Sequence, residues 1–176
     1  MIHQAQSNHA KAEEFFSQAL TLYESFGYNL SQANALQGLG QIHQVQSNYA
    51  KAEECFSQAL AIYKSVKSSH GQANALLGLG EIHQARSSHA KAEECFSQAL
   101  TLYESVGYNV AQANSLVRLS EVLTCQARYS EAKPLLDDAA QLSNRINYEW
   151  ALARSRELLA EISEAEKSST EPSLYM

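Results

Sequence analysis

The chain has 176 residues, a formal net charge of −6, and 45% hydrophobic residues. Nucleic-acid binding depends on clustered Lys and Arg, so this acidic balance argues against a nucleic-acid partner. No apolar run approaches the roughly 20 residues that span a bilayer, and the N-terminus has no apolar signal region. The composition therefore predicts a cytoplasmic globular protein without a membrane partner.

A forty-residue repeat is the main feature of the sequence. Closely similar segments begin at Ser7, Ser47 and Ser87, and a divergent fourth copy begins near Tyr129. A fixed period in this range is typical of solenoid proteins, in which each unit buries its apolar faces only against its neighbours.

Each copy contains two amphipathic helical stretches. In residues 49–66, Ala52, Phe56 and Ala59 recur at three- and four-residue steps, and residues 70–86 show a similar stripe. No strand-like alternation is present. The pattern predicts an all-α fold, an α-solenoid of antiparallel helix pairs.

Polar residues and glycines mark the expected helix ends. Gly27 and Gly107 each follow an apolar run, where a glycine can adopt the left-handed C′ conformation that ends a helix. Three further positions precede a Gln by three residues, the spacing of a capping box: Asn29, Ser69 and Asn109.

Gly40 and Gly80 fall inside predicted helices. Gly in a helix interior costs about 1 kcal/mol relative to Ala. We therefore expect a neighbouring helix to approach closely at both positions, with small residues such as Ala52 and Ala92 facing them.

The repeat resembles the tetratricopeptide repeat. Its segment Leu36-x-x-Leu39-Gly40-x-x-His43, followed by Tyr49-x-x-Ala52-x-x-x-Phe56-x-x-Ala59, is similar to the family signature. The third copy departs from it, with Ser120 for Gly and Leu136 for Phe. The unit also has 40 residues where 34 are usual. It resembles the long-repeat subclass of Pins/LGN and kinesin light chain, and the near-duplicate copies are similar to repeat tails of fungal NACHT/NB-ARC sensor proteins.

The resemblance implies a right-handed superhelix in which an A helix precedes the B helix of each repeat. Aligned in this way, the chain divides into six segments. They are an N-terminal half-repeat at 1–29 (the end of an A helix plus helix B1), repeats at 30–66, 70–106 and 109–143, a capping helix at 146–165, and a disordered tail at 166–176.

In the family, A helices line a concave groove. The positions that the resemblance assigns to this groove are Asn34, Gln37, Gln41, Asn74, Leu77, Glu81, Asn114, Val117 and Glu121. An Asn amide both donates and accepts, so Asn34, Asn74 and Asn114 are expected to form a ladder for the backbone of an extended peptide. The alternative is that they satisfy neighbouring helix ends or are merely solvated.

An acidic row accompanies the Asn positions at Glu81, Glu121 and Glu161. It favours a neutral or basic ligand, although a solvated helix face explains it equally well.

The sequence shows no arrangement for catalysis, a metal or a cofactor. His3, His43 and His83 occur once per repeat, which places them too far apart to share a metal ion. Cys55 and Cys95 stand where the first copy has Phe15, so we interpret them as packed apolar residues. We therefore expect a protein that is not an enzyme and has no cofactor.

The function predicted is a protein–protein interaction scaffold that binds an extended peptide or partner segment in the groove. The alternative is a self-associating module of a larger signalling or sensor protein. A homodimer would then form through the exposed apolar side of the N-terminal half-repeat, at Phe15, Phe16, Leu20 and Leu22.

Overall fold

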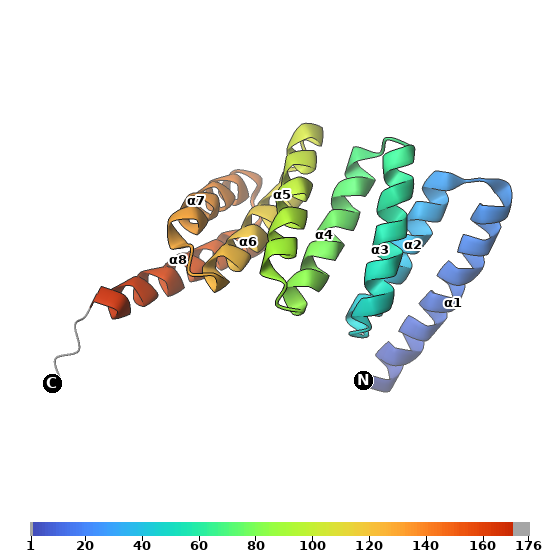
Figure 1. Ribbon diagram of the computed structural model, residues 1–176, viewed down its shortest axis with the longest axis horizontal. Helices are drawn as coiled ribbons and strands as arrows, with labels where there is room; N and C mark the ends of the chain where they lie inside the picture. The colour runs from blue at the N-terminus through green and yellow to red at the C-terminus, as the bar shows by residue number, and fades with distance from the viewer. Residues whose placement is uncertain (1, 171–176) are drawn as a thin grey trace. The chain divides into compact units, whose positions relative to one another are not determined.

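The computed structural model describes residues 2–170, with side chains for 9–169. This range contains eight α-helices and no strand, which confirms the all-α prediction (Figure 1). The helices are α1 (Ile2–Phe26), α2 (Asn29–Val45), α3 (Tyr49–Ser65), α4 (Ser69–Ala85), α5 (His89–Val106), α6 (Asn109–Cys125), α7 (Tyr129–Ile146) and α8 (Glu149–Thr170).

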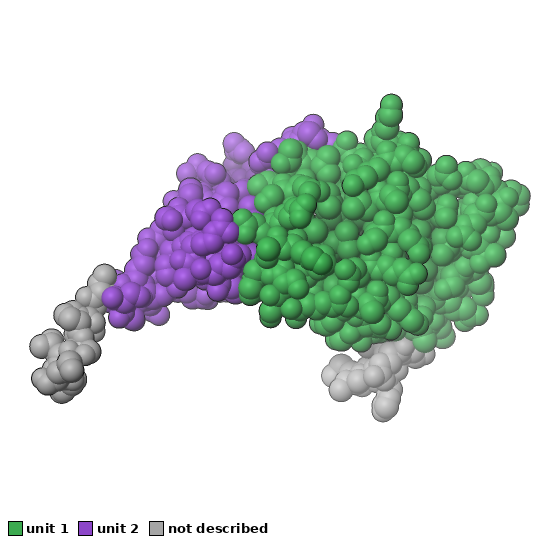
Figure 2. All heavy atoms as spheres, in the orientation of Figure 1, with its two compact units in different colours: residues 1–102 green, residues 103–176 purple. Residues whose placement is uncertain are grey.

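The helices form two compact units, residues 1–102 and residues 103–176, coloured separately in Figure 2. In unit 1, α1 packs on α2, α2 on α3 and α3 on α4, and the alternate helices α2 and α4 also touch. In unit 2, α6 packs on α7 and α7 on α8, and α6 touches α8. Within each unit, these consecutive helices are packed as neighbours, as expected for stacked helix pairs.

Phenylalanine rings packed on glycines form the centre of unit 1. The ring of Phe56 lies between Gly40 on α2 and Gly78 on α4, where an added methyl group would come within 3.0 Å and 2.6 Å of it. At Gly80 on α4, a methyl group would lie 2.5 Å from the ring of Phe96 on α5. The expected close approach at Gly40 and Gly80 is confirmed, and the facing group is an aromatic ring rather than the predicted alanines.

Residues with a left-handed backbone conformation (positive φ) follow most of the helices. Gly27 and Gly107 have φ of +69° and +68°, which confirms the C′ prediction. Similar φ values of 55° to 59° occur without glycine after other helices, at Ser47, Lys67, Ser87, Ala127 and Asn147. These five positions were not predicted from the sequence; of the five, only Asn147 is a residue type that adopts this region readily.

The predicted capping boxes are wrong by one residue. The carbonyl of Tyr28 already accepts the N–H of Gln32 at 2.9 Å, so α2 begins one residue earlier than expected. Before α4, Ser68 caps the helix with its side chain, accepting the N–H of Gly71 at 3.3 Å. The glutamines instead reach back to the preceding helix, as when Gln112 donates to Glu104 at 3.3 Å.

The two ends of the chain differ from the expected pattern. Helix α1 runs from Ile2 to Phe26 without the break expected between an A-helix end and B1. Helix α8 continues to Thr170, so the first five residues of the predicted disordered tail, 166–170, are helical. The remainder of that tail, 171–176, lies outside the described residues.

Candidate functional site: polar surfaces of α2, α4, α6 and α8

A polar hollow lies between α2 and α4 in unit 1, with a volume of ≈ 180 Å³. Its lining consists of Gln37, Gln41, Gln44, Phe56, Asn74, Leu77, Gly78 and Glu81. Five of the nine predicted groove residues therefore meet around one depression. Amide groups dominate its wall, and Phe56 and Leu77 add apolar surface. We call this depression the α2–α4 hollow.

Hydrogen bonds order the side chains of the α2–α4 hollow. Gln44 donates from Nε2 to the Glu81 carboxylate at 2.8 Å, which joins α2 to α4. The amide nitrogen of Asn74 lies 3.2 Å from Nε2 of His70. Gln41 is an exposed residue in the lining of the hollow. The hollow thus combines internally bonded groups with a glutamine available to a ligand.

Asn34 holds a core tyrosine. The hydroxyl of Tyr63, which is 2% exposed, lies 2.7 Å from Oδ1 of Asn34 and 3.0 Å from Oε1 of Gln37. A phenol has one proton, so it donates to one of these oxygens and the other amide must present its NH2 group. Burial raises the pKa of Tyr63. Asn34 therefore supports packing, whether or not it also meets a ligand.

Asn114 has the same role in unit 2 through a different tyrosine. The hydroxyl of Tyr148 donates to Oδ1 of Asn114 at 2.9 Å. Tyr63 lies 29 residues after Asn34, whereas the residue 29 positions after Asn114 is Ser143, and Tyr148 follows it by five residues. Two of the three Asn residues thus serve neighbouring elements, which favours the alternative reading of the ladder at Asn34 and Asn114.

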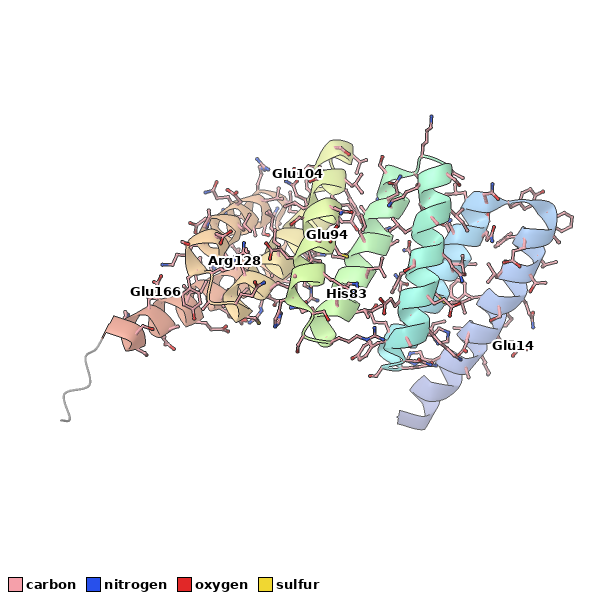
Figure 3. All side chains as sticks on the ribbon, in the orientation of Figure 1. Glu14, His83, Glu94, Glu104, Arg128 and Glu166 are labelled. Carbon is pink, nitrogen blue, oxygen red and sulfur yellow. The ribbon has the colours of Figure 1, made fainter. Side chains whose placement is uncertain are left out.

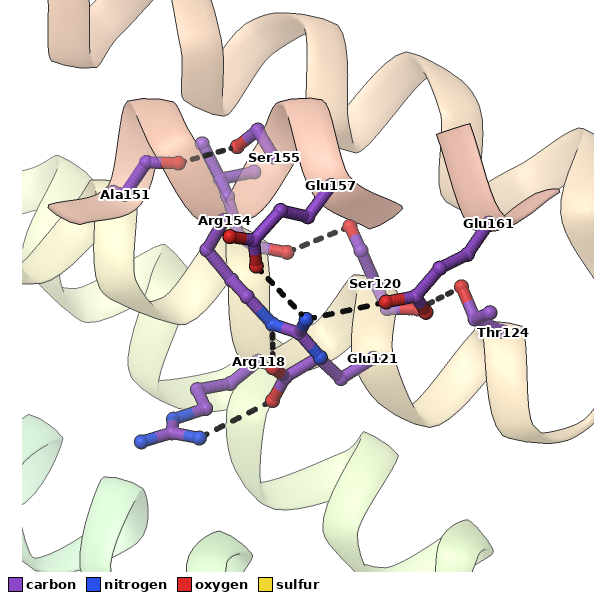
Figure 4. Close-up of polar contacts among 10 residues, drawn as sticks. Arg118, Ser120, Glu121, Thr124, Ala151, Arg154, Ser155, Glu157 and Glu161 are labelled. Atoms are coloured by element: carbon purple, nitrogen blue, oxygen red, sulfur yellow. Dashed lines mark hydrogen bonds and ion pairs between the residues drawn. The ribbon is translucent and has the colours of Figure 1, made fainter. Parts of the chain in front are cut away.

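Unit 2 carries an ion-pair network at the equivalent surface (Figure 4). Nε of Arg154 lies 2.8 Å from the Glu121 carboxylate, and Arg118 approaches the same carboxylate at 3.2 Å. Arg154 also lies 3.3 Å from Glu157 and 3.4 Å from Glu161. The hydrogen bond to Glu121 raises the pKa of Arg154. Two members of the predicted acidic row, Glu121 and Glu161, therefore have cationic partners.

Val117 is not a groove residue. It is 0% exposed, so it belongs to the core of unit 2 and cannot contact a partner. Leu77, at the same repeat position, is half-buried and lines the α2–α4 hollow. The family resemblance assigns both residues to the groove, but the residue at this position in unit 2 is buried.

Sequence reasoning missed an aromatic surface beside the ion-pair network. The guanidinium of Arg118 lies 5.6 Å from the ring of Trp150, a cation–π contact, and Tyr148 lies 6.1 Å from the same ring. Trp150 is 44% exposed. Trp150 is the only Trp in the sequence, and this is the one sequence feature that could have indicated the aromatic surface.

The four predicted self-association residues on α1 fall into two groups. Phe15 and Leu22 are 70% and 57% exposed. Phe16, 36% exposed, lies against Gly38 of α2, and Leu20 packs against the core cluster that contains Leu36. Phe15 and Leu22 therefore project from the packed part of α1.

Two of the three cysteines have raised pKa values. Burial raises the pKa of Cys55, and it raises the pKa of Cys95 to about 11, so both remain thiols at neutral pH. Glu14 on α1 and Glu94 on α5, at the same repeat position, are exposed side chains (Figure 3). Within residues 2–170 no group of three His, Cys, Asp or Glu is placed to hold a metal ion.

Two further properties bear on the function. Burial lowers the pKa of His83, so its imidazole is neutral at pH 7. No helix in the described range is long and apolar enough to cross a membrane.

Comparison with known proteins gives one family and a set of similar folds. Residues 1–65 and 71–145 match the model of the tetratricopeptide repeat. No curated protein matches the chain.

Among solved structures, the crystal structure of BtubC (BKLC) from P. vanneervenii matches with a TM-score of 0.73 at 17% identity, over 81% of this chain and 59% of that one. The chain thus spans about three fifths of that relative's length. A Podosopora anserina putative kinesin light chain with nearly identical TPR-like repeats matches with a TM-score of 0.70 at 17% identity, over 94% of this chain and 85% of that one. A variant of the same Podosopora anserina protein gives a TM-score of 0.71 at 16% identity, with the same coverage. The predicted likeness to kinesin light chain repeats is confirmed at the level of fold, and the likeness to NACHT/NB-ARC tails stays a prediction.

Proposed function

This chain belongs to the tetratricopeptide repeat family, whose repeats mediate protein–protein interaction, and we propose that it binds an extended peptide or partner segment in the α2–α4 hollow. The observation that carries the proposal is the convergence of five predicted groove residues around that hollow. An amide-lined depression with an apolar floor suits a peptide, because amides bond to its backbone and the floor accepts a side chain.

Gln41 and Leu77 are the residues most suited to test the proposal. Both line the α2–α4 hollow. The side chain of Asn34, by contrast, is hydrogen-bonded to the hydroxyl of core Tyr63, so its replacement would perturb the fold together with any binding. We therefore assign recognition chiefly to Gln41 and Leu77, with Gln37, Asn74 and Glu81 framing the site.

The experiment selects peptides from a random display library on the purified chain and measures their binding by fluorescence anisotropy. The double variant Gln41→Ala/Leu77→Ala is expected to weaken binding at least about tenfold, as loss of one hydrogen bond and one apolar contact implies. Gln58→Ala, on the exposed face of α3, is the matched control and should bind as the unchanged chain does. Equal affinity of all three proteins would rule the hollow out as the binding site.

We further propose that the chain acts without catalysis or a cofactor, and that it works in the cytoplasm. The raised pKa values of Cys55 and Cys95 support the first part, since such thiols are poor nucleophiles. The three cysteines form no disulfide, which is consistent with a reducing compartment.

A second candidate function is self-association through the apolar side of α1. It is favoured by the exposure of Phe15 and Leu22, 70% and 57%, on a helix whose repeat equivalents are better covered. A homodimer or a longer assembly satisfies this observation. Light scattering over a concentration series tests it, and a molecular mass of one chain at all concentrations would end it.

A further inference from the structure

A second pocket lies inside unit 2, with a volume of ≈ 220 Å³. Its lining residues are Glu104 of α5, Gln112 and Leu116 of α6, and Asp138, Gln141, Leu142 and Arg145 of α7. We call it the α5–α7 pocket. Because a helix turns by about 100° per residue, Gln112 and Leu116 lie on the face of α6 opposite to Asn114 and Glu121. The pocket is therefore separate from the ion-pair network of the same unit.

The α5–α7 pocket has an apolar floor and a charged rim. Leu116 and Leu142 are each 5% exposed and form the floor. Glu104 is exposed in the last turn of α5, and Gln112 donates to its carboxylate at 3.3 Å. Two carboxylates and the single guanidinium of Arg145 leave an excess of negative charge around the floor. Such a pocket favours a ligand with an apolar stem and a positive charge.

The carboxylate of Asp138 is left unpaired by a change that occurs only in α7. In α1, α3 and α5 the equivalent residue is a glutamine that donates to the glutamate one turn earlier, at 3.1, 3.3 and 3.2 Å. In α7, Pro134 replaces that glutamate. Among the described residues, Asp138 consequently has no hydrogen-bond or ion-pair partner.

The two other polar residues of α7 at the pocket show the same change. Gln141 replaces a threonine of α1 and of α5, and each threonine donates to a carbonyl of its own helix at 3.1 Å. Arg145 replaces a serine of α1 and of α3, which donate in the same way at 2.8 and 2.7 Å. Within residues 9–169, neither Gln141 nor Arg145 has a hydrogen-bond or ion-pair partner. Three polar groups of one pocket are thus available to a ligand.

Asp138 also weakens its own helix. It lies in the interior of α7, where Asp is a poorer helix former than the Gln of the other copies. The sequence contains only two Asp residues, and they are adjacent at 137 and 138. We expect a residue that disfavours its helix, and bonds to nothing in the described part of the chain, where a group outside the chain requires it.

We propose that the α5–α7 pocket binds a single arginine side chain of a partner protein. Its volume is below the roughly 300 Å³ at which pockets for drug-sized ligands begin, so it suits one side chain better than a whole small molecule. The stem of the arginine lies on Leu116 and Leu142, and its guanidinium donates to Asp138 and to the carbonyl oxygen of Gln141. Arginine is favoured over lysine because its planar fork serves a carboxylate and an amide together.

Arg145 restricts the pocket to one positive charge. It lies in the last turn of α7, seven residues after Asp138, which is about 10 Å along the helix axis. A second basic residue beside the bound arginine would approach Arg145 and be repelled. The pocket therefore selects an isolated arginine and rejects a basic run. This site goes beyond the proposed α2–α4 hollow and does not depend on it.

Nuclear magnetic resonance with the peptide acetyl-Ala-Arg-Ala-amide tests the proposal. At millimolar peptide we expect shifts of the side-chain amide signals of Gln112 and Gln141, and none with a peptide in which uncharged citrulline replaces arginine. Asp138→Gln restores the residue of the other copies and should weaken binding at least about tenfold, as loss of a charged hydrogen bond implies. Arg145→Ser removes the repulsion and should strengthen binding about two- to fivefold.

Two control variants separate this site from other effects. Asp137→Gln removes the same charge from an adjacent exposed position outside the pocket lining, and it should bind the peptide as the unchanged chain does. Gln41→Ala/Leu77→Ala should also bind it unchanged, so the two proposals fail separately. Circular dichroism checks that the variants keep their helices. Equal losses in Asp137→Gln and Asp138→Gln, equal shifts with the citrulline peptide, or no shift with the arginine peptide would each overturn the proposal.

Discussion

The two units have different residues at two equivalent core positions of their A and B helices. In unit 1, Gly80 of α4 receives the ring of Phe96 from α5. At the equivalent positions unit 2 has Ser120, which is fully buried, and Leu136. The larger residue on the A helix is matched by a smaller one on the B helix. We infer that the combined volume of the two residues, rather than glycine alone, sets the spacing of the helices at this position.

The polar surfaces of the two units also carry different residue types. Unit 1 presents amides around the α2–α4 hollow, whereas unit 2 presents Glu121 between Arg118 and Arg154, with Trp150 beside them. A hollow lined by amides leaves room for a ligand, and a network of mutually paired charges satisfies itself. This difference is why we assign the peptide site to unit 1.

The largest expected effect comes from moving a unit 2 residue into unit 1. Gly80→Ser places a side chain within 2.5 Å of the Phe96 ring, and we expect a loss of about 2–3 kcal/mol in the free energy of unfolding from overpacking. Phe96→Leu alone should cost about 1–2 kcal/mol. The double variant recreates the unit 2 pair, so it should cost at least about 1 kcal/mol less than the sum. Urea unfolding of the four proteins measures this cycle.

The control for that cycle is Gln58→Ser on the exposed face of α3, which changes helix propensity without touching a ring. Additive costs in the double variant would show that the two positions are not coupled, and the paired-volume explanation would then fail.

A smaller effect is expected from the tyrosine hydroxyls. Tyr63→Phe removes the hydrogen bond to Asn34, and we expect a loss of about 1–1.5 kcal/mol at neutral pH. Tyr148→Phe removes the equivalent bond to Asn114 from a half-buried residue, so its cost should be smaller. Thermal and urea unfolding compare the two.

The effect of Tyr63 also depends on pH. Because burial raises the pKa of Tyr63 in the folded state, the folded protein favours the neutral phenol. This contribution is fully present below the unfolded-state pKa of about 10 and is lost as pH rises through the higher folded-state pKa. The stability difference between the unchanged chain and Tyr63→Phe should therefore shrink above pH ~10. A difference that stays constant there contradicts this explanation.

The sequence was sufficient for the helices and their pairing. The forty-residue period and stripes such as Ala52, Phe56 and Ala59 repeat one local pattern, so each copy reinforces the prediction from the others. Gly40 and Gly80 also predicted a close approach of a neighbouring helix. Gly destabilises a helix interior, so we expect it there where a neighbouring helix needs the space.

The side-chain network of the site lay beyond sequence reasoning. Arg154 meets Glu121, 33 residues earlier, and Tyr63 meets Asn34, 29 residues earlier. Such pairs depend on the rotation of one helix about its axis relative to another, which periodicity alone leaves undetermined by tens of degrees. For the same reason Leu77 and Val117 share a repeat position, yet Leu77 lines a hollow and Val117 is buried.

The third effect concerns the charges of unit 2. Arg154→Met keeps the aliphatic stem and removes the contacts with Glu121, Glu157 and Glu161. We expect a loss of about 0.5–1 kcal/mol at low ionic strength, because these groups are partly solvated. The loss should fall in 1 M salt, where the Debye length is about 3 Å. Arg156→Met, at an exposed position of the same helix, serves as control. A loss that salt does not change would show packing, not charge, as the cause.

The last expected effects are gains of similar size, one in each unit. Lys67, after α3, and Ala127, after α6, have φ of 56°, a region that costs an L residue roughly 1–2 kcal/mol. Glycine removes that cost but loses more backbone freedom on folding, so we expect Lys67→Gly and Ala127→Gly each to stabilise by about 0.5–1 kcal/mol. Gly107→Ala, the reverse exchange at φ +68° with open space around it, should destabilise by a similar amount. Urea unfolding measures all three variants, and equal gains in both units would show that the turn geometry is shared. A loss on introducing glycine would mean that the side chain of Lys67 or Ala127 stabilises its turn.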